Sequence, residues 1–253
     1  MNEHIKTLPA DYKPRQNLLQ NKIILVTGAG GGIGRTAAIT FAQYGATVVL
    51  TGRTLQKLET VYDEIEAAGL PQPAIYPINF EGAKESDFTE MCNILEAEFG
   101  QLDGILHNAS ELGDRMPLRD YACDTWSRVM QVNVNAPFML SQALLPLLLR
   151  ASHASIVFTG SSVGRQGRAY WGAYAASKAA QENLMQTLAD ELADDEIHVN
   201  SINPGATRTQ MRAAAYPAED PSTLKTPEDL MPLYLYLIGE DSQNITGQRF
   251  NAQ

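Results

Sequence analysis

The stretch Thr27-Gly28-Ala29-Gly30-Gly31-Gly32-Ile33-Gly34 comes after a short β-branched run at residues 22–27 and is followed at once by a helical pattern. Glycines permit a tight turn and let the backbone approach a pyrophosphate, whose charge is stabilised by free N–H groups and by the positive end of the helix dipole. Ile33 stands where the last glycine of the G-x-G-x-x-G fingerprint belongs, so the spacing is Gly28-x-x-x-Gly32-x-Gly34. A purely structural strand–helix turn is the alternative, but the position after the first predicted strand favours a phosphate-binding site.

Outward from this turn, short β-branched runs alternate with longer segments of helical period, which is the pattern of βα units around a parallel sheet. The predicted strands are residues 22–27, 47–51, 74–78, 104–107, 155–159, 198–202 and 248–251. The predicted helices cover residues 32–44, 55–68, 85–99, 124–150, 171–193 and 227–239. Right-handed crossovers between such strands predict an α/β fold, a single doubly wound Rossmann-type domain with a six- to seven-stranded parallel sheet flanked by helices.

The chain of 253 residues is close to the upper length of a single domain, and we find no linker or repeat in it. We expect one domain over residues 21–253 and an N-terminal surface arm over residues 1–20, which lacks the apolar segment of a secretory signal. Residues 206–226 are the segment richest in Pro and small residues, and we interpret them as a mobile flap rather than a domain boundary.

Charge and composition argue against several classes of partner. The net charge of -10 and the pI near 4.9 disfavour nucleic acid, which needs clustered Lys and Arg. The longest apolar stretch, residues 143–149, is broken by Pro146 and is far shorter than the roughly 20 residues of a membrane span. Cys92 and Cys123 have no metal-ligand spacing around them and are interpreted as buried thiols. We therefore expect a cytoplasmic protein with no metal, no nucleic-acid partner and no membrane partner.

The end of the second predicted strand, Leu50-Thr51-Gly52-Arg53-Thr54, indicates which cofactor the glycine turn would hold. NAD sites usually place an acidic residue here for the ribose 2′-hydroxyl, whereas NADP sites place an arginine nearby for the 2′-phosphate. No acid occurs before Glu59, and Arg53 can bind a phosphate through paired charge-assisted hydrogen bonds. A solvated surface arginine is the alternative, but a cation is unfavourable at a helix N-terminus. The sequence favours NADP(H).

Tyr174 and Lys178 are four residues apart, so a helix stacks them on one face. A nearby ammonium, together with the positive nicotinamide ring of an oxidised cofactor, should lower the pKa of Tyr174 from about 10 towards neutral. Tyr174 could then donate or accept the proton of a substrate oxygen. The Tyr-x-x-x-Lys pattern alone also arises by chance on ordinary surface helices.

Two polar residues upstream strengthen the catalytic interpretation. Ser161 follows the fifth predicted strand, at the edge where such sheets carry ligand groups, and its hydroxyl could hold a carbonyl oxygen. Asn133 lies inside an apolar helical stretch, where its side chain needs a partner; the alternative is a capping or kink-satisfying role ahead of Pro137. His107 ends a strand and is interpreted as a structural group rather than a catalytic base.

Together these motifs resemble the short-chain dehydrogenase/reductase family, from about Asn21 to the C-terminus. The glycine motif of the family corresponds to residues 27–34, its Asn-Ser-Tyr-Lys tetrad to Asn133, Ser161, Tyr174 and Lys178, and its nicotinamide loop to Pro204-Gly205 with Thr209. The resemblance implies that Tyr174 is the acid/base, that Lys178 binds the nicotinamide ribose and tunes Tyr174, and that Ser161 orients the substrate oxygen. It also implies that Asn133 holds a water that continues a proton relay from Lys178.

Two stretches depart from the family pattern. The usual Asn-Asn-Ala-Gly after the fourth strand reads His107-Asn108-Ala109-Ser110, and the Asp that often contacts adenine is replaced by Asn79 beside Phe80. The cofactor site implied by the resemblance comprises Thr27, Gly28, Gly30, Gly32, Ile33, Gly34, Arg53, Thr54, Asn79, Phe80, Asn108, Ala109, Tyr174, Lys178, Pro204, Gly205, Thr207 and Thr209.

The function expected from these features is an NADP(H)-dependent oxidoreductase that moves a hydride between the nicotinamide and a carbonyl or secondary alcohol of a small or medium substrate. The alternative is an NADP(H)-binding sensor or scaffold with little or no turnover. Enoyl reduction fits poorly, because the related enoyl reductases use a longer Tyr–Lys spacing. The substrate stays open, since residues 111–117 and the flap shape the pocket. A homodimer or homotetramer is implied, because the two long helices pair between subunits in this family.

Overall fold

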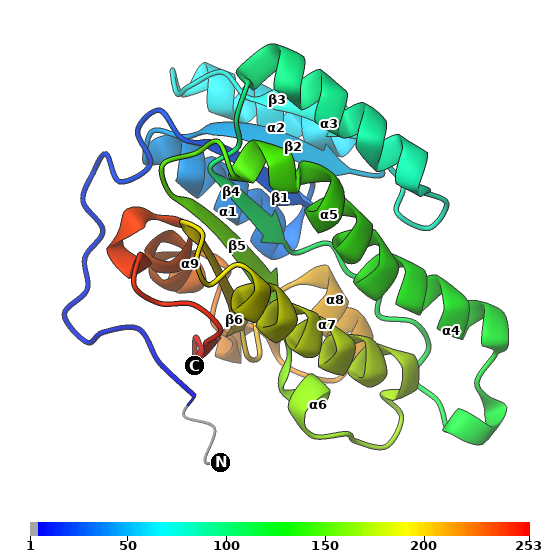
Figure 1. The fold of residues 1–253 in the computed structure, drawn as a ribbon. Coiled ribbons are helices and arrows are strands. Elements are labelled where there is room, and N and C mark those ends of the chain that lie inside the picture. The colour runs from blue at the N-terminus through cyan, green and yellow to red at the C-terminus, as the bar shows by residue number, and fades with distance from the viewer. Residues whose placement is uncertain (1–4) are drawn as a thin grey trace.

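The computed structural model describes residues 5–253, so residues 1–4 of the predicted arm lie outside the described part of the chain. Seven parallel strands form one sheet in the order β3-β2-β1-β4-β5-β6-β7 (Figure 1). Their bounds are β1 Ile23–Thr27, β2 Thr47–Gly52, β3 Ala74–Pro77, β4 Gly104–His107, β5 Ala154–Thr159, β6 Ile197–Asn203 and β7 Arg249–Asn251. The strand order reverses between β1 and β4, which is where doubly wound sheets bind ligands. The predicted fold class is confirmed.

Helices cover both faces of the sheet. One face packs against α1 (Gly32–Gln43), α2 (Leu55–Ala67) and α9 (Met231–Ile238). The other packs against α3 (Glu85–Phe99), α5 (Ala136–Leu148) and α7 (Gly172–Glu191). The shorter helices are α4 (Cys123–Met130), α6 (Ser162–Arg165) and α8 (Gln210–Ala215). Because both faces are covered, the inner strands are buried along their length, as in the run Val48, Val49 and Leu50.

The helix predicted over residues 124–150 is interrupted in the structure. A π-helical turn, Gln131–Asn135, separates α4 from α5. Pro137 has no N–H, so the ordinary α-helical bond to the carbonyl of Asn133 cannot form, and π turns of this kind are frequent at functional sites. The last predicted helix, residues 227–239, likewise divides into a 3-10 turn, Glu228–Leu230, and α9. The two cysteines were expected to be buried, but Cys123 is exposed and Cys92 is only partly buried.

The described part of the N-terminal arm is attached to the domain. Lys6 pairs with β7, where its N–H donates to the carbonyl of Arg249 at 2.9 Å. Tyr12 packs edge-on against Tyr236 of α9, with ring centroids 4.9 Å apart. Leu18 and the residue after it are buried in the core. The described part of the arm therefore begins beside β7, near the C-terminus, and runs along the outside of the molecule to β1, as Figure 1 shows.

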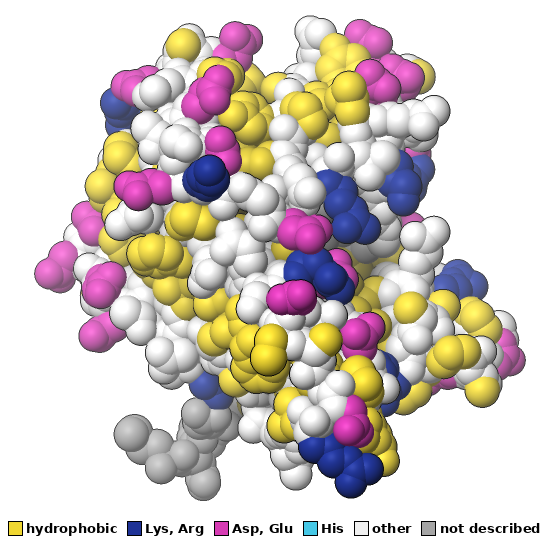
Figure 2. All heavy atoms as spheres, turned by 90° about the vertical axis from the view of Figure 1, so that its right-hand side faces the viewer, with side chains coloured by type: hydrophobic (Ala, Val, Ile, Leu, Met, Phe, Trp, Pro, Cys, Tyr) yellow, Lys and Arg dark blue, Asp and Glu magenta, His cyan; other side chains and the backbone are white. Residues whose placement is uncertain are grey.

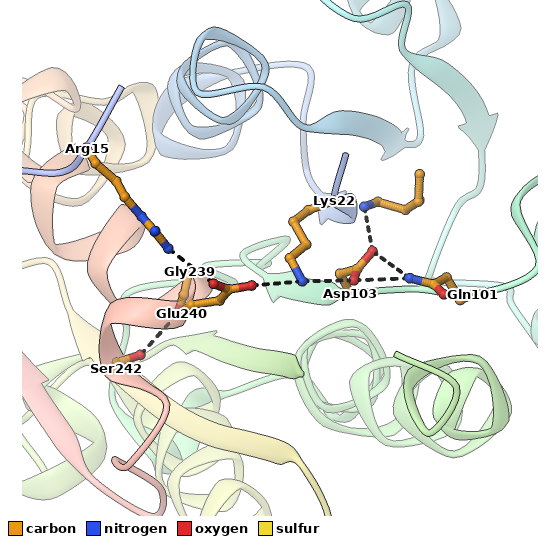
Figure 3. A network of polar contacts seen from close by, with 8 residues as sticks. Arg15, Lys22, Gln101, Asp103, Gly239, Glu240 and Ser242 are labelled. Carbon is orange, nitrogen blue, oxygen red and sulfur yellow. Dashed lines mark hydrogen bonds and ion pairs between the residues drawn. The ribbon is translucent and has the colours of Figure 1, made fainter. Parts of the chain in front are cut away.

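An ion-pair network joins the arm to the amino edge of the sheet (Figure 3). Glu240, which follows α9, accepts from Arg15 at 3.1 Å and pairs with Lys22 at 3.2 Å. Lys22 also reaches Asp103 at 3.4 Å, and the carboxylate of Asp103 accepts from the backbone N–H of Ile23 at 2.8 Å. This network ties the starts of β1 and β4 together.

Across the described residues, no helix has the length and apolar character needed to cross a bilayer. Figure 2 shows basic, acidic and hydrophobic side chains interspersed on one face of the molecule. That face has no uniform basic field of the kind that nucleic-acid binding uses.

Candidate active site

A cleft of about 530 Å³ opens at the carboxyl edge of the sheet. Most of the residues predicted from the sequence line it: Gly28, Gly30, Gly32, Ile33, Arg53, Thr54, Asn108, Ala109, Ser161, Tyr174, Lys178, Pro204, Gly205, Thr207 and Thr209. Five predicted residues do not line it, and each has a different local role: Thr27, Gly34, Asn79, Phe80 and Asn133. Parallel strands that end side by side bring these distant segments together.

The glycine turn between β1 and α1 forms one end of the cleft. Gly28 has φ +69, and a Cβ there would lie 3.1 Å from the backbone of Ala109. At Gly34 a Cβ would lie 2.3 Å from the carbonyl oxygen of Gly28, so this glycine allows α1 to pack against the turn rather than to face the cleft. Gly31 has open space where a Cβ would point. The backbone is therefore free to approach a ligand.

Thr27 holds this end of the cleft together from below. Its hydroxyl accepts from the backbone N–H groups of Asn108 at 2.9 Å and Ala109 at 3.0 Å, and donates to the carbonyl of Leu106 at 3.2 Å. These bonds fix the end of β1 against the end of β4. Thr27 therefore positions the segments that were predicted to bind a cofactor, without lining the cleft itself.

Arg53 and Thr54 follow β2 and line the far end of the cleft beside Lys57. Lys57 was missed in the sequence analysis, although it stands one helical turn after Arg53 at the start of α2. Asn79 and Phe80 are not part of this wall. The side chain of Asn79 accepts from the N–H of Glu81 within its own turn, and Phe80 packs in the core. A local Asx turn competes for the side chain that was expected near adenine.

Tyr174 lies on the first turn of α7 and reaches Ser161, which follows β5. Burial raises the pKa of Tyr174 to about 12, while hydrogen bonds from Ser161 and Ser110 act to lower it. Burial dominates in the protein by itself, where the ammonium of Lys178 lies 5.5 Å from the centre of the ring and bonds the carbonyl of Thr159. The fall of the pKa towards neutral stays a prediction for the protein with an oxidised nicotinamide bound.

Lys178 is 1% exposed. Its ammonium donates to the carbonyl of Thr159 and to the side chain of Gln181, both at 2.8 Å. Burial lowers the pKa of Lys178 to about 7, and the negative charge of Glu182, one helical turn later, acts to raise it. Gln181 and Glu182 were missed in the sequence analysis, although their spacing of three and four residues from Lys178 places them on its helix face.

Asn133 is fully buried in the π turn. Its amide N–H groups donate to the carbonyl of Glu111 and to the hydroxyl of Ser177, both at 2.9 Å. Its side-chain oxygen accepts from the N–H of Glu111 at 2.7 Å and the hydroxyl of Ser110 at 3.2 Å. The side chain therefore joins the loop after β4 to α7. Both of its N–H groups and its oxygen are already engaged, so a relay water would have to use main-chain groups here.

His107 is a structural group, as interpreted from its position. Its ring stacks on Phe158 at 4.5 Å, and its Nε2 lies 2.9 Å from the hydroxyl of Ser141. Burial, with a smaller contribution from the charge of Lys178, lowers the pKa of His107 to about 3. The imidazole is neutral throughout the physiological range.

The loop after β6 closes the middle of the cleft. The N–H of Gly205 donates to the side-chain oxygen of Asn203 at 3.2 Å, and Thr207 donates to the carbonyl of Pro204 at 3.2 Å. Thr209 caps α8 by accepting from the N–H of Arg212 at 3.1 Å. Side-chain bonds therefore fix this loop on both sides of Gly205.

An apolar end of the cleft lies beyond Tyr174, where Leu112, Val163, Trp171 and Tyr216 line the wall. Arg115, missed in the sequence analysis, crosses from the loop after β4 to the flap and donates to the carbonyl of Ala215. Its guanidinium lies 4.4 Å from the ring centre of Trp171 and 4.8 Å from that of Tyr216. Three segments meet in this stack, which closes the cleft over its apolar end.

Comparisons with known proteins agree with this geometry. The sequence model of the family described as short chain dehydrogenase matches residues 22–220. The oxidoreductase YciK of Escherichia coli K12 is 54% identical over 96% of both chains. A crystal structure of a short chain dehydrogenase from Salmonella enterica serovar Typhi is 54% identical, with a TM-score of 0.94, over 96% of this chain and 100% of that one. A protein from Escherichia coli CFT073, complexed with NADPH, is 55% identical, with a TM-score of 0.92, over 95% and 100% of the two chains.

Proposed function

The chain belongs to the short-chain dehydrogenase family of oxidoreductases, and from that premise we propose that it uses NADP(H) to transfer a hydride to or from a carbonyl carbon. The observation that carries this proposal is the cleft itself. One wall holds the glycine turn and Arg53, and the other holds Ser161, Tyr174 and Lys178. A cofactor and the groups that handle a substrate proton therefore fit in one cavity.

The cofactor end of the cleft suits a dinucleotide with a 2′-phosphate. The backbone at Gly31 is open, and Gly28 and Gly34 have the close approaches that a tight phosphate-binding turn needs. Arg53 and Lys57 both line this end, and no acidic side chain of residues 5–253 lines the cleft. The complex of the Escherichia coli CFT073 relative with NADPH supports the same assignment. When bound, the nicotinamide supplies the hydride.

Tyr174 would serve as the proton donor in the reducing direction. With its pKa raised to about 12, it is a neutral phenol near pH 7 and is ready to give its proton to a forming alkoxide. The hydroxyl of Ser161, already within reach of Tyr174, would hold the substrate oxygen. The protonated form of Lys178, whose ammonium lies 5.5 Å from the ring centre, would stabilise through its charge the tyrosinate that remains.

The substrate enters, in this proposal, at the apolar end formed by Leu112, Val163, Trp171 and Tyr216. The test is NADPH consumption by the purified protein against ketones, aldehydes, quinones and acyl thioesters, with NADH in parallel. Turnover with at least one carbonyl class is expected. Tight NADPH binding without consumption of any class would favour the sensor alternative.

The proposal also covers the oligomeric state of the protein and its location in the cell. A homodimer or homotetramer through α4, α5 and α7 is expected, since Phe138 on α5 is 47% exposed and Leu118 beside α7 is 65% exposed. Light scattering at micromolar concentration measures this, and a monomer would contradict it. The free thiols of Cys92 and Cys123 support a reducing, cytoplasmic location.

A further inference from the structure

Glu182 carries a carboxylate that is buried behind the proposed catalytic residues. The residue is 3% exposed and lies on α7. Its two oxygens accept from the hydroxyl of Ser201 on β6 at 3.1 and 2.9 Å. Arg249 of β7 pairs with it at 3.0 Å, and Arg165 of α6 approaches it at 4.0 Å. The carboxylate therefore joins four elements that meet under the cleft.

The same carboxylate lies against the segment that carries Ser161. A Cβ built on Gly160 would lie 2.5 Å from a carboxylate oxygen of Glu182, so glycine is needed at this position for the two to fit. Lys178 stands one helical turn before Glu182, with its ammonium on the carbonyl of Thr159, two residues before Ser161. Glu182 thus leaves no room for a side chain at Gly160, the residue before Ser161, and acts electrostatically on Lys178.

A second route leads from Glu182 to the loop that carries Gly205. Arg165 donates to the side-chain oxygen of Asn251 at 3.1 Å, and the same oxygen accepts from the amide of Asn203 at 3.1 Å. The side-chain oxygen of Asn203 in turn accepts from the N–H of Gly205 at 3.2 Å. The route begins with the 4.0 Å ion pair between Glu182 and Arg165, crosses between distant elements through the two hydrogen bonds to Asn251, and ends with a local bond within the turn after β6.

We propose that Glu182 is a positioning residue, which holds the Ser161 segment, the Gly205 loop and the charge of Lys178 in the arrangement that hydride transfer requires. This inference rests on the proposed function, in which the nicotinamide end of the cofactor lies beside Ser161, Tyr174 and Lys178. Burying a carboxylate is costly unless several partners satisfy it, and replacing such a group by packed apolar residues is often neutral or stabilising. A contribution to the geometry and charge of the site gives this buried charge a role beyond stability.

The charged and titratable groups around Glu182 can be named by element. Arg165 and Arg249 face it from α6 and β7, and Lys178 precedes it on α7. Around Lys178 stand Tyr174 on the same helix and His107 of β4, which is neutral. Removing the negative charge of Glu182 therefore favours the uncharged form of Lys178.

The principal test is Glu182→Gln, which keeps the shape of the side chain and removes its charge. Binding of NADPH is compared with binding of adenosine 2′,5′-bisphosphate, a fragment that lacks the nicotinamide. We expect NADPH to bind several-fold more weakly and the fragment to bind as in the wild type. General loosening of the fold would weaken both ligands.

Turnover supplies a second readout on any carbonyl compound that the wild type reduces. We expect kcat to fall about tenfold or more, as misplacement of catalytic groups does, with a small change in the KM of the carbonyl. The alkaline limb of the kcat profile should move to lower pH, because Lys178 loses its proton more easily without the carboxylate. Glu182→Asp should recover part of the pH shift.

Two further variants separate the routes. Asn251→Ala breaks the path to Gly205 and leaves the carboxylate and its charge in place, so NADPH should bind more weakly with no movement of the pH limb. Glu240→Gln makes the same chemical change in the network of Figure 3, at the opposite edge of the sheet. It should change neither the affinity for the two ligands nor the pH profile of kcat.

If Glu182→Gln bound both NADPH and the fragment with the affinity of the wild type, the inference would be overturned, whatever the turnover of the variant. Equal losses for NADPH and the fragment would overturn it as well, since the role would then be general stability. Absence of wild-type turnover on every carbonyl would instead count against the proposed function, and the ligand comparison would still decide the role of Glu182.

Discussion

The two edges of the sheet each carry a lysine near a glutamate, in different surroundings. At the amino edge, 17% of the side chain of Lys22 and 40% of that of Glu240 are exposed, and the pair joins the arm to the sheet. At the carboxyl edge, Lys178 and Glu182 are 1% and 3% exposed. Exposed pairs are screened by solvent and contribute little. Burial instead lowers the pKa of Lys178 to about 7, so the same side-chain types form a titrating group near neutral pH.

The hydrogen-bond partners of the charged groups also differ between the two edges. Asp103 at the amino edge accepts from the backbone of Ile23 and from Gln101 as well as from Lys22, so several groups share one charge. The ammonium of Lys178 has two neutral oxygen partners, from Thr159 and Gln181. Because its bonded partners are neutral, the protonation of Lys178 responds to the nearby charge of Glu182 and to what binds beside it. The carboxyl edge is therefore suited to chemistry, and the amino edge to holding segments together.

The largest effect is expected for Tyr174→Phe, which removes the hydroxyl at the carboxyl edge and keeps the ring. Without a positioned proton donor, kcat should fall by roughly 10²- to 10⁴-fold. NADPH affinity and thermal stability should stay close to those of the wild type. Steady-state kinetics and fluorescence titration measure both, and a variant that kept more than about a tenth of wild-type kcat would refute the assignment of Tyr174.

Lys178→Met tests whether burial lowers the pKa of this lysine in the folded protein. The folded-state pKa of about 7 lies below the unfolded value of 10.5, so the unfolded chain binds more protons between these limits. The unfolding free energy of the wild type should therefore rise with pH relative to the variant, by up to about 1.4 kcal/mol per pH unit from pH 7 to pH 9. Urea unfolding at several pH values measures the difference, and a flat difference would contradict the lowered pKa.

Arg53→Ala tests the cofactor end of the same edge. Arg53 lines the cleft, and none of the described residues that line it is acidic, so its removal should reduce NADPH affinity about tenfold, a change of about 1.4 kcal/mol. NADH affinity should change little, and Gly52→Asp should reverse the preference. Titration of both cofactors measures this, and equal wild-type affinities would remove the basis of the assignment.

The smallest effect is expected at the amino edge. Arg15→Ala breaks a pair whose side chains are 60% and 40% exposed, so the unfolding free energy should fall by less than about 1 kcal/mol. Activity should not change. A loss of activity comparable to that of a carboxyl-edge variant would show that the two edges do not divide the roles as described.

The parts of the molecule that could be predicted from the sequence are local or periodic. The strands, the glycine turn and the Tyr174–Lys178 spacing each depend on residues close together in the chain. The bounds of several helices differ by a few residues from the predicted ones. The π turn that divides the long helix before residue 150 was not predicted, because it depends partly on the partners that Asn133 finds on other segments. Pro137 was the available local signal.

Contacts between distant segments could not be predicted. The pairing of Glu182 with Arg249 and the reach of Arg115 to Ala215 depend on how loops fold over the sheet. The raised pKa of Tyr174 in the protein by itself was not foreseen for the same reason, because spacing alone does not reveal that burial dominates and that Lys178 bonds Thr159. Asn79 was placed at the adenine by resemblance, whereas its own turn engages its side chain.

Transfer of label from NADPH tests the central claim most directly. The protein is incubated with NADPH deuterated at the nicotinamide C4 and with a carbonyl compound that the consumption screen identifies, and the alcohol is examined by mass spectrometry. We predict deuterium on the carbinol carbon from the wild type and at least a roughly hundredfold slower appearance with Tyr174→Phe. NADPH that binds with wild-type affinity but delivers no deuterium to any carbonyl class would contradict the claim that this cleft performs hydride transfer.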